Sequence, residues 1–201
     1  MDGTLVNCTE LQTHILREVL TNFGVDTSSM DLSKLIGPPL SRTFAEYFGV
    51  ENVELAFDKY KQLYITTPIH SVYLMPGIRQ LLITLRDLGY RLFVTSLQIQ
   101  SVVQSELQHL DILQYFDRVY GDNIDKPYSS KAEVIADLMS ELDIDPAQTV
   151  MVGDTDNDLL GGASHGMTTI GVMWGYGKDA FGNIPYTIDT ADQLLSILHK
   201  L

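Results

Sequence analysis

The segment Gly153-Asp154-Thr155-Asp156-Asn157-Asp158 gathers carboxylates directly after the apolar run Thr149 to Val152. Asp154 and Asp158 lie four residues apart where a predicted strand passes into a predicted helix. Both carboxylates can therefore face one point at the carboxyl end of the strand, which is where open parallel sheets bind ligands. Carboxylate oxygens suit Mg²⁺, so the segment predicts a metal site. The alternative is a turn and helix cap with solvated acids.

Two further segments carry groups that suit a phosphate. Thr95 and Ser96 end the predicted strand Arg91 to Val94, where a hydroxyl can bind a phosphate oxygen, although both are also ordinary turn residues. Lys131 begins a predicted helix, where the helix dipole disfavours a cation, and this misfit indicates a phosphate contact. Lys126 is the rival candidate. Either lysine can instead be a solvated surface residue.

Other candidate motifs are weaker. Asp2-Gly3-Thr4 is by itself an ordinary turn signal near a terminus. Gly175-Tyr176-Gly177 lacks the Lys-Ser/Thr pair of a P-loop, so we interpret it as a tight turn beside the site. The five histidines do not have the spacing of a zinc site; they are His14, His70, His109, His165 and His199.

The elements that must position these residues alternate between strands and helices from about Val72 onward, which is typical of a parallel sheet covered by helices on both faces. The apolar patterns predict strands at 91–95, 118–120, 149–152, 168–172 and 186–188, and helices at 78–88, 98–110, 131–142, from 157, and at 191–200. Residues from about 9 to 70 instead show only helical patterns, at 11–20, 44–48 and 53–64. We therefore expect an α/β fold, a doubly wound, Rossmann-like parallel sheet core (residues 1–8 and 72–201) with an inserted all-helical domain (residues 9–71).

Composition limits the function classes. The chain has 201 residues, a formal charge of −13 and one cysteine, Cys8, so it forms no intrachain disulfide. The acidic balance disfavours a nucleic-acid or membrane-surface partner. No segment reaches the roughly 18 apolar residues of a membrane span, and the N-terminus lacks a secretory signal pattern. We expect a cytoplasmic protein, a monomer or homodimer. If such an acidic protein acts on phosphate esters, it needs a bound divalent cation and one or two well-placed cationic side chains in its site.

The motifs, taken in order along nearly the whole chain, resemble the haloacid dehalogenase superfamily, and specifically its phosphoglycolate-phosphatase-like group with a small helical cap. The resemblance implies a Mg²⁺-dependent phosphatase that acts on small phosphorylated metabolites. It places Asp2 on the acid/base position, Thr95 on the phosphate-binding position and Lys131 on the stabilising lysine. Asp2, Asp154 and Asp158 fall on the metal side. Arg42, in Gly37-Pro38-Pro39-Leu40-Ser41-Arg42, matches a cap segment that approaches the substrate.

In the superfamily pattern Asp-x-Asp-Gly-Thr, the first Asp is the nucleophile that forms an aspartyl phosphate. Met1 falls on the x position here, so we expect the nucleophile directly before Met1, on an apolar strand. A non-catalytic protein that binds phosphate and metal is one alternative. Another chemistry on the same scaffold, such as phosphomutase transfer or carbon–halogen cleavage, is a second. Dehalogenation would not need Asp154 and Asp158, which favours phosphate chemistry.

Overall fold

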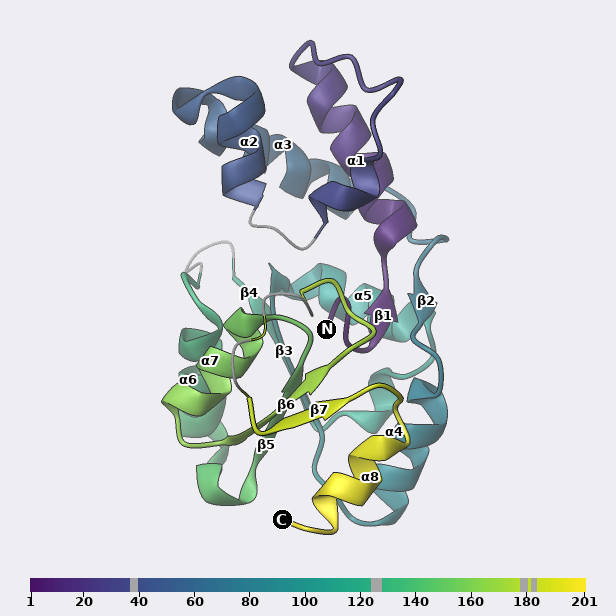
Figure 1. Ribbon diagram of the computed structural model, residues 1–201, viewed down its shortest axis with the longest axis vertical. Helices are drawn as coiled ribbons and strands as arrows, with labels where there is room; N and C mark the ends of the chain where they lie inside the picture. Colours follow the sequence, from purple (N-terminus) through teal and green to yellow (C-terminus); the bar gives the residue numbers. More distant parts are fainter. Residues whose placement is uncertain (37–39, 124–127, 178–180, 182–183) are drawn as a thin grey trace. The chain divides into compact units, whose positions relative to one another are not determined.

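The computed structural model describes residues 1–36, 40–123, 128–177, 181 and 184–201. The chain divides into two compact units, one formed by Met1–Asn7 with Tyr73–Leu201 and the other by Cys8–Val72. The first unit contains the strands and the second is helical (Figure 1). The role of the helical unit as a cap stays a prediction.

The α/β unit contains parallel sheets, as the sequence predicted. Its strands are β1 (Val6–Asn7), β2 (Tyr73–Leu74), β3 (Phe93–Ile99), β4 (Arg118–Asp122), β5 (Val150–Gly153), β6 (Thr168–Val172) and β7 (Tyr186–Ile188). Strands β3 and β4 pair in parallel, β5, β6 and β7 form a second parallel sheet in that order, and β1 pairs with β2 in antiparallel orientation. Among the described residues no ladder joins β3 to β5, so each of these two strands has one edge without a strand partner.

Helices pack on both faces of these sheets, with α6 and α7 on one side and α4 and α8 on the other (Figure 1). The helices are α4 (Ile78–Asp87), α5 (Gln100–His109), α6 (Lys131–Leu142), α7 (Asp156–Ser164) and α8 (Gln193–Leu198), with single 3₁₀ turns η3 (Leu113–Tyr115) and η4 (Pro146–Gln148). Helix α6 begins where Ser130 caps it, because the Ser130 hydroxyl accepts a hydrogen bond from the Glu133 amide. Its apolar face buries Val134, Ile135 and Leu138.

Strand β3 is longer than the sequence predicted. The expected end at Thr95 was wrong, because the strand runs on to Ile99 and the next helix begins at Gln100 rather than at Gln98. Its register against β4 is irregular between Thr95 and Ile99, where Ile99 pairs with Asp122. The polar segment that looked like a turn is therefore a distorted end of a strand.

The helical unit consists of α1 (Thr9–Asn22), η1 (Leu32–Leu35), α2 (Leu40–Phe48), η2 (Val50–Asn52) and α3 (Val53–Thr66). Its core is aromatic: the fully buried Phe44 ring packs against the rings of Phe48, Phe57 and Tyr60. Residues 37–39, part of the segment singled out around Arg42, lie outside the described residues.

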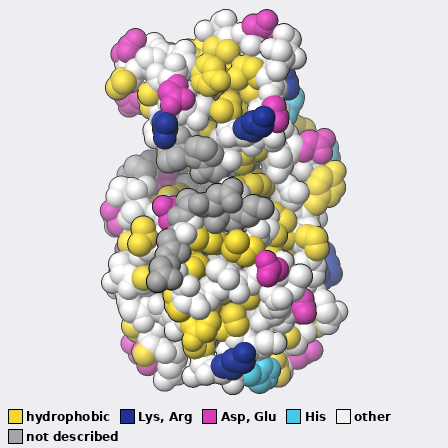
Figure 2. Space-filling view, viewed as in Figure 1, with side chains coloured by type: hydrophobic (Ala, Val, Ile, Leu, Met, Phe, Trp, Pro, Cys, Tyr) yellow, Lys and Arg dark blue, Asp and Glu magenta, His cyan; other side chains and the backbone are white. Residues whose placement is uncertain are grey.

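The surface carries the acidic balance of the sequence. On the face shown in Figure 2, Asp and Glu side chains are dispersed over both units rather than gathered in one patch. In the described part of the chain, no helix has the length and apolar character needed to cross a membrane.

Candidate active site

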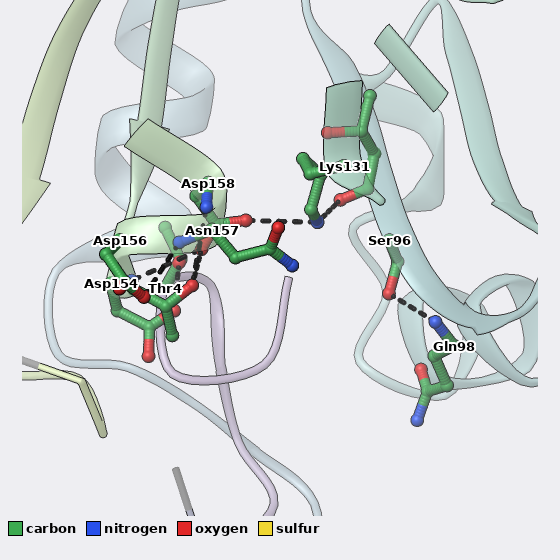
Figure 3. Close-up of polar contacts among 10 residues, drawn as sticks. Thr4, Ser96, Gln98, Lys131, Asp154, Asp156, Asn157 and Asp158 are labelled. Atoms are coloured by element: carbon green, nitrogen blue, oxygen red, sulfur yellow. Dashed lines mark hydrogen bonds and ion pairs between the residues drawn. The ribbon is translucent and has the colours of Figure 1, made fainter. Parts of the chain in front are cut away.

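Asp154 follows the last residue of β5 and is almost completely buried, with 2% of its surface exposed. Its Oδ1 accepts a hydrogen bond from the Thr4 hydroxyl at 2.9 Å (Figure 3). Its Oδ2 accepts one from the Tyr176 amide at 3.0 Å. Glycines make this close packing feasible, because a Cβ on Gly3 would lie 2.0 Å from Asp154 Oδ2 and one on Gly175 would lie 2.1 Å from Asp154 Cβ. The carboxylate is therefore fixed by both chain segments that approach it.

Asp158 lies in the first turn of α7 and has two roles. Its Oδ2 accepts hydrogen bonds from the hydroxyl and amide of Thr155, which in turn accepts the Asp158 amide, so the two residues form a capping box. Its Oδ1 lies 3.0 Å from the Nζ of Lys131. Asp158 therefore combines the two interpretations that the sequence allowed, because it caps the helix and also belongs to a charged site. The acid is buried, however, and not solvated as a plain cap would be.

Lys131 begins α6, as predicted, and is buried rather than solvated, with 5% of its surface exposed. Its Nζ donates to the backbone carbonyl of Thr95 at 2.8 Å as well as pairing with Asp158 (Figure 3). The ammonium thus links the end of β3 to the first turn of α7. The rival candidate Lys126 lies outside the described residues.

The pKa values of the two acids move in opposite directions. Burial raises the pKa of Asp154, although the α-ammonium of Met1 and the Tyr176 amide oppose this shift. Burial acts in the same direction on Asp158, but the Lys131 and Met1 ammonium groups outweigh it, so the pKa of Asp158 is lowered. A cation close to both carboxylates is therefore favourable, and Asp154 gains the most from one.

The phosphate-binding candidates Thr95 and Ser96 lie beside Lys131 at the distorted end of β3. The Thr95 carbonyl accepts the Lys131 ammonium, and the Ser96 side chain, 5% exposed as a residue, accepts a hydrogen bond from the Gln98 amide at 3.1 Å. The Ser96 hydroxyl proton remains available to an oxygen acceptor. The structure therefore brings Thr95, Ser96, Lys131 and Asp158 together.

Two further candidates, Asp2 and Arg42, lie outside the group formed by Thr95, Ser96, Lys131 and Asp158. Asp2 is half-buried in the turn before β1 and adjoins Gly3, which packs on Asp154. Arg42 belongs to the helical unit, where its exposed side chain pairs with Glu46 at 3.0 Å, one helical turn away. Its assignment to a substrate contact stays a prediction.

Sequence reasoning missed the groups that hold the acids in place. Thr155 was passed over, although Thr followed three residues later by an acid is a capping-box signal. The Tyr176 amide was missed because a backbone donor has no signal in residue type. Trp174 also contributes, since its Nε1 donates to the carbonyl of Thr4 at 3.1 Å and so supports the turn that carries Asp2 and Thr4.

The buried acids fit a magnesium ion in part. Mg²⁺ usually binds one or two carboxylates and keeps several water molecules. Asp154 supplies one desolvated carboxylate whose oxygens each have a further lone pair. Within the described ranges, no group of three His, Cys, Asp or Glu side chains is placed to hold a metal. Water and backbone oxygens would complete such a shell.

Residues 1–172 match the family model described as haloacid dehalogenase-like hydrolase. The chain belongs to this family. The resemblance inferred from the motifs is thereby confirmed, and the parallel sheets with an all-helical unit agree with solved structures of the family. A predicted phosphatase from Clostridium acetobutylicum superposes with a TM-score of 0.88 at 30% identity, over 100% of this chain and 96% of that one.

Among curated relatives, the tyrosine-protein kinase PtkA of Mycobacterium tuberculosis is 32% identical over 182 residues, or 90% of this chain. The 5′-nucleotidase of Pseudomonas aeruginosa is 28% identical over 89% of this chain and 82% of its own length. The chain spans only 62% of the length of PtkA.

Proposed function

We propose that this protein is a Mg²⁺-dependent phosphatase of small phosphomonoesters that works through an aspartyl phosphate. The observation that carries the proposal is the buried Lys131 ammonium, which contacts Asp158 Oδ1 and the Thr95 carbonyl. Asp154, at the end of β5 and four residues before Asp158, is buried as well. A desolvated cation flanked by desolvated acids suits the stabilisation of a phosphoryl group whose charge grows during transfer. The names of the matched relatives, phosphatase, 5′-nucleotidase and tyrosine-protein kinase, all denote phosphoryl transfer.

We further propose that the nucleophilic Asp lies directly before Met1, at the end of a strand between β3 and β5. Two observations support this position. One edge of β3 and one edge of β5 lack a strand partner among the described residues, and unpaired edges favour the addition of a strand. The apolar residues Val150–Val152 of β5 are only half-buried, whereas Ile170 and Val172 of β6 are fully buried. Parallel sheets are normally buried on both faces, so β5 has room for a neighbour.

In this mechanism the upstream carboxylate attacks phosphorus, and the bond from phosphorus to the ester oxygen breaks. Asp2 donates a proton to the departing alkoxide and then takes a proton from the water that hydrolyses the aspartyl phosphate. Thr95 and Ser96 bind phosphate oxygens, Lys131 offsets their charge, and Arg42 contacts the substrate from the cap. Asp2, Asp154 and Asp158 hold or support Mg²⁺, which supplies charge neutralisation when it is bound.

Burial raises the pKa of Asp154, and the α-ammonium of Met1 opposes that shift; at Asp158 the same ammonium adds to the lowering of the pKa by Lys131. In a chain with residues before Met1, this group is a neutral peptide N–H, and the two acids lose its positive charge. Such a chain has a stronger need for a metal cation close to Asp154 and Asp158.

The substrate is a small phosphorylated metabolite. We expect the protein to act in the cytoplasm as a monomer or homodimer, without nucleic-acid or membrane partners.

The test compares Mg²⁺-dependent phosphate release from an aryl phosphate by two chains. One begins at Met1 and the other carries the in-frame residues encoded directly upstream. We expect turnover from the longer chain only, and its loss when the upstream Asp is changed to Asn. Asp154→Asn in the longer chain should abolish turnover, whereas Asp156→Asn, at an exposed position of the same segment, should leave it intact.

Each other outcome selects a different function. A longer chain that binds inorganic phosphate and Mg²⁺ without turnover would identify a binding protein. Faster transfer to a sugar hydroxyl than to water would identify a phosphomutase. An upstream sequence without an apolar run ending in Asp, together with turnover by the chain from Met1, would show that another group is the nucleophile.

A further inference from the structure

Glu106 is a buried carboxyl group that the proposed mechanism does not use. It lies on α5 with no exposed surface, on the same buried helix face as Val102, Val103 and Leu107. A carboxyl group is among the side chains that are least often buried, because it loses its hydration there. Its burial at a position where an apolar side chain would pack without this cost indicates a task other than packing.

The contact of Glu106 leads to the phosphate-binding segment. Its Oε1 accepts a hydrogen bond from the side-chain amide of Gln98 at 3.4 Å. The backbone amide of the same Gln98 donates to the Ser96 hydroxyl oxygen at 3.1 Å. Figure 3 shows the Gln98 side chain extending away from Lys131, so that Ser96 lies between the two. Glu106 is therefore linked to Ser96 through one residue.

This segment needs such support because the β-ladder does not hold it. The register of β3 against β4 is broken between Thr95 and Ile99, which leaves Ser96, Leu97 and Gln98 out of regular pairing. On one side Lys131 holds the Thr95 carbonyl. On the other side the side-chain amide of Gln98 donates to Glu106. The end of the strand is thus fixed by two polar side chains from different helices.

The link also carries a cost, which bears on its purpose. The Oε1 atom of Gln98 is buried and has no hydrogen-bond partner within the described residues. A buried acceptor left unsatisfied destabilises a protein. A pair of apolar side chains at 98 and 106 would avoid this loss, so the polar pair is poorly explained by stability.

We propose that Glu106 is a positioning residue, which acts through Gln98 to hold the Ser96 hydroxyl where it binds a phosphate oxygen of the substrate. The proposal rests on the proposed function, because it assigns a support to the phosphate-binding residue of that site. Glu106 itself contacts no reacting atom.

The test uses Glu106→Leu and Glu106→Gln in the full chain that shows Mg²⁺-dependent turnover. Leu fills a similar volume without an acceptor, and Gln retains a side-chain oxygen that can accept from Gln98. We expect Glu106→Leu to raise the KM for the aryl phosphate and the Kd for inorganic phosphate by about 5- to 10-fold, with kcat changed much less, as loss of one hydrogen bond in both ground and transition states predicts. Glu106→Gln should retain most of the phosphate affinity.

Two controls separate positioning from packing. Gln108→Leu, on the exposed side of α5, should change neither constant. Mg²⁺ affinity, followed by the fluorescence of Trp174, the single tryptophan, should be the same in Glu106→Leu and the parent chain. Stability measured by urea unfolding should fall in Glu106→Leu, which leaves the Gln98 amide without its acceptor, and should be equal to the parent or higher when Glu106→Leu is combined with Gln98→Met, because both polar partners are then replaced.

Gln98→Met should reproduce the rise in KM, and the double variant Gln98→Met with Glu106→Leu should be no worse than either single variant, since both break one link. Gln98→Met alone tests the proposal if Glu106→Leu does not fold. Unchanged KM and phosphate Kd in Glu106→Leu and Gln98→Met, in a parent chain that does bind phosphate, would overturn the positioning role alone. A parent chain that binds no phosphate would overturn the proposed function and this role together.

Discussion

The Nζ of Lys131 lies 3.0 Å from the Oδ1 of Asp158, and the two side chains are only 7% and 8% exposed. This buried ion pair joins the start of α6 to the first turn of α7. Since the Thr95 carbonyl and the Thr155 hydroxyl satisfy further atoms of the pair, the charges are hydrogen-bonded as well as paired. Loss of one partner of such a pair destabilises a protein more than replacement of both partners does.

Lys131→Met should therefore be strongly destabilising. It leaves the Asp158 carboxylate buried without its cation, and we expect a loss of about 3–5 kcal/mol in the free energy of unfolding. Lys131→Met combined with Asp158→Asn should lose distinctly less, because no uncompensated charge remains. Urea unfolding of the single and double variants at neutral pH measures both effects. A single variant as stable as the parent would mean that solvent reaches Asp158 and screens it.

Asp154 should make stability depend on pH in the absence of metal. Its folded-state pKa is raised above the ordinary value of 3.8 by burial, so its favourable contribution is complete below that value and is lost as pH rises through the folded pKa. In chelating buffer, Asp154→Asn should be more stable than the parent at about pH 7 and no more stable at about pH 4. The midpoints of urea unfolding at the two pH values give this difference.

Asp158 has the opposite sign, because its folded pKa is lowered. Its contribution is present above the unfolded value of 3.8 and is lost as pH falls through the lower folded pKa. The Asp154→Asn comparison removes Asp154 alone and leaves the Asp158 contribution in both chains. A stability difference between parent and Asp154→Asn that does not change with pH would contradict the raised pKa of Asp154.

Magnesium should stabilise the parent chain and not Asp154→Asn. A ligand present at 100 times its Kd stabilises a folded protein by about 2.7 kcal/mol. We expect a gain of this size for the parent and for Asp156→Asn, whose exposed carboxylate accepts a hydrogen bond from the neighbouring Asn157 amide. Urea midpoints with and without Mg²⁺ provide the measurement. An equal gain in Asp154→Asn would place the metal at another site.

Sequence spacing predicted the acids and the lysine because their signals are local. Asp154 and Asp158 follow an apolar run at a strand-to-helix junction. Lys131 is a cation at a helix start, where the helix dipole favours an anion. The antiparallel pair β1–β2 had no such signal, since it joins Val6 to Leu74 through two-residue strands. Likewise, the distortion of β3 depends on contacts of Gln98 and Lys131 with distant residues, which no periodicity records.

Local strain at the end of α6 gives the last prediction. Asp143 ends the helix in the left-handed conformation, with φ 49° and ψ 57°, which is costly for any residue with a Cβ. Asp143→Gly should raise the free energy of unfolding by a few tenths to about 1 kcal/mol, the part of the relief that remains after the added freedom of the unfolded chain. Phosphatase activity should not change, because Lys131 lies at the opposite end of the same helix.

Asp111→Gly is the matched comparison. The φ of Asp111 is 52°, but its carboxylate lies 3.7 Å from Arg79, so the relief of backbone strain is partly offset by the loss of an ion pair. Thermal or urea unfolding of both variants should therefore rank Asp143→Gly above Asp111→Gly, and a decrease in stability for Asp143→Gly would show that its side chain stabilises the end of the helix by more than the strain it imposes.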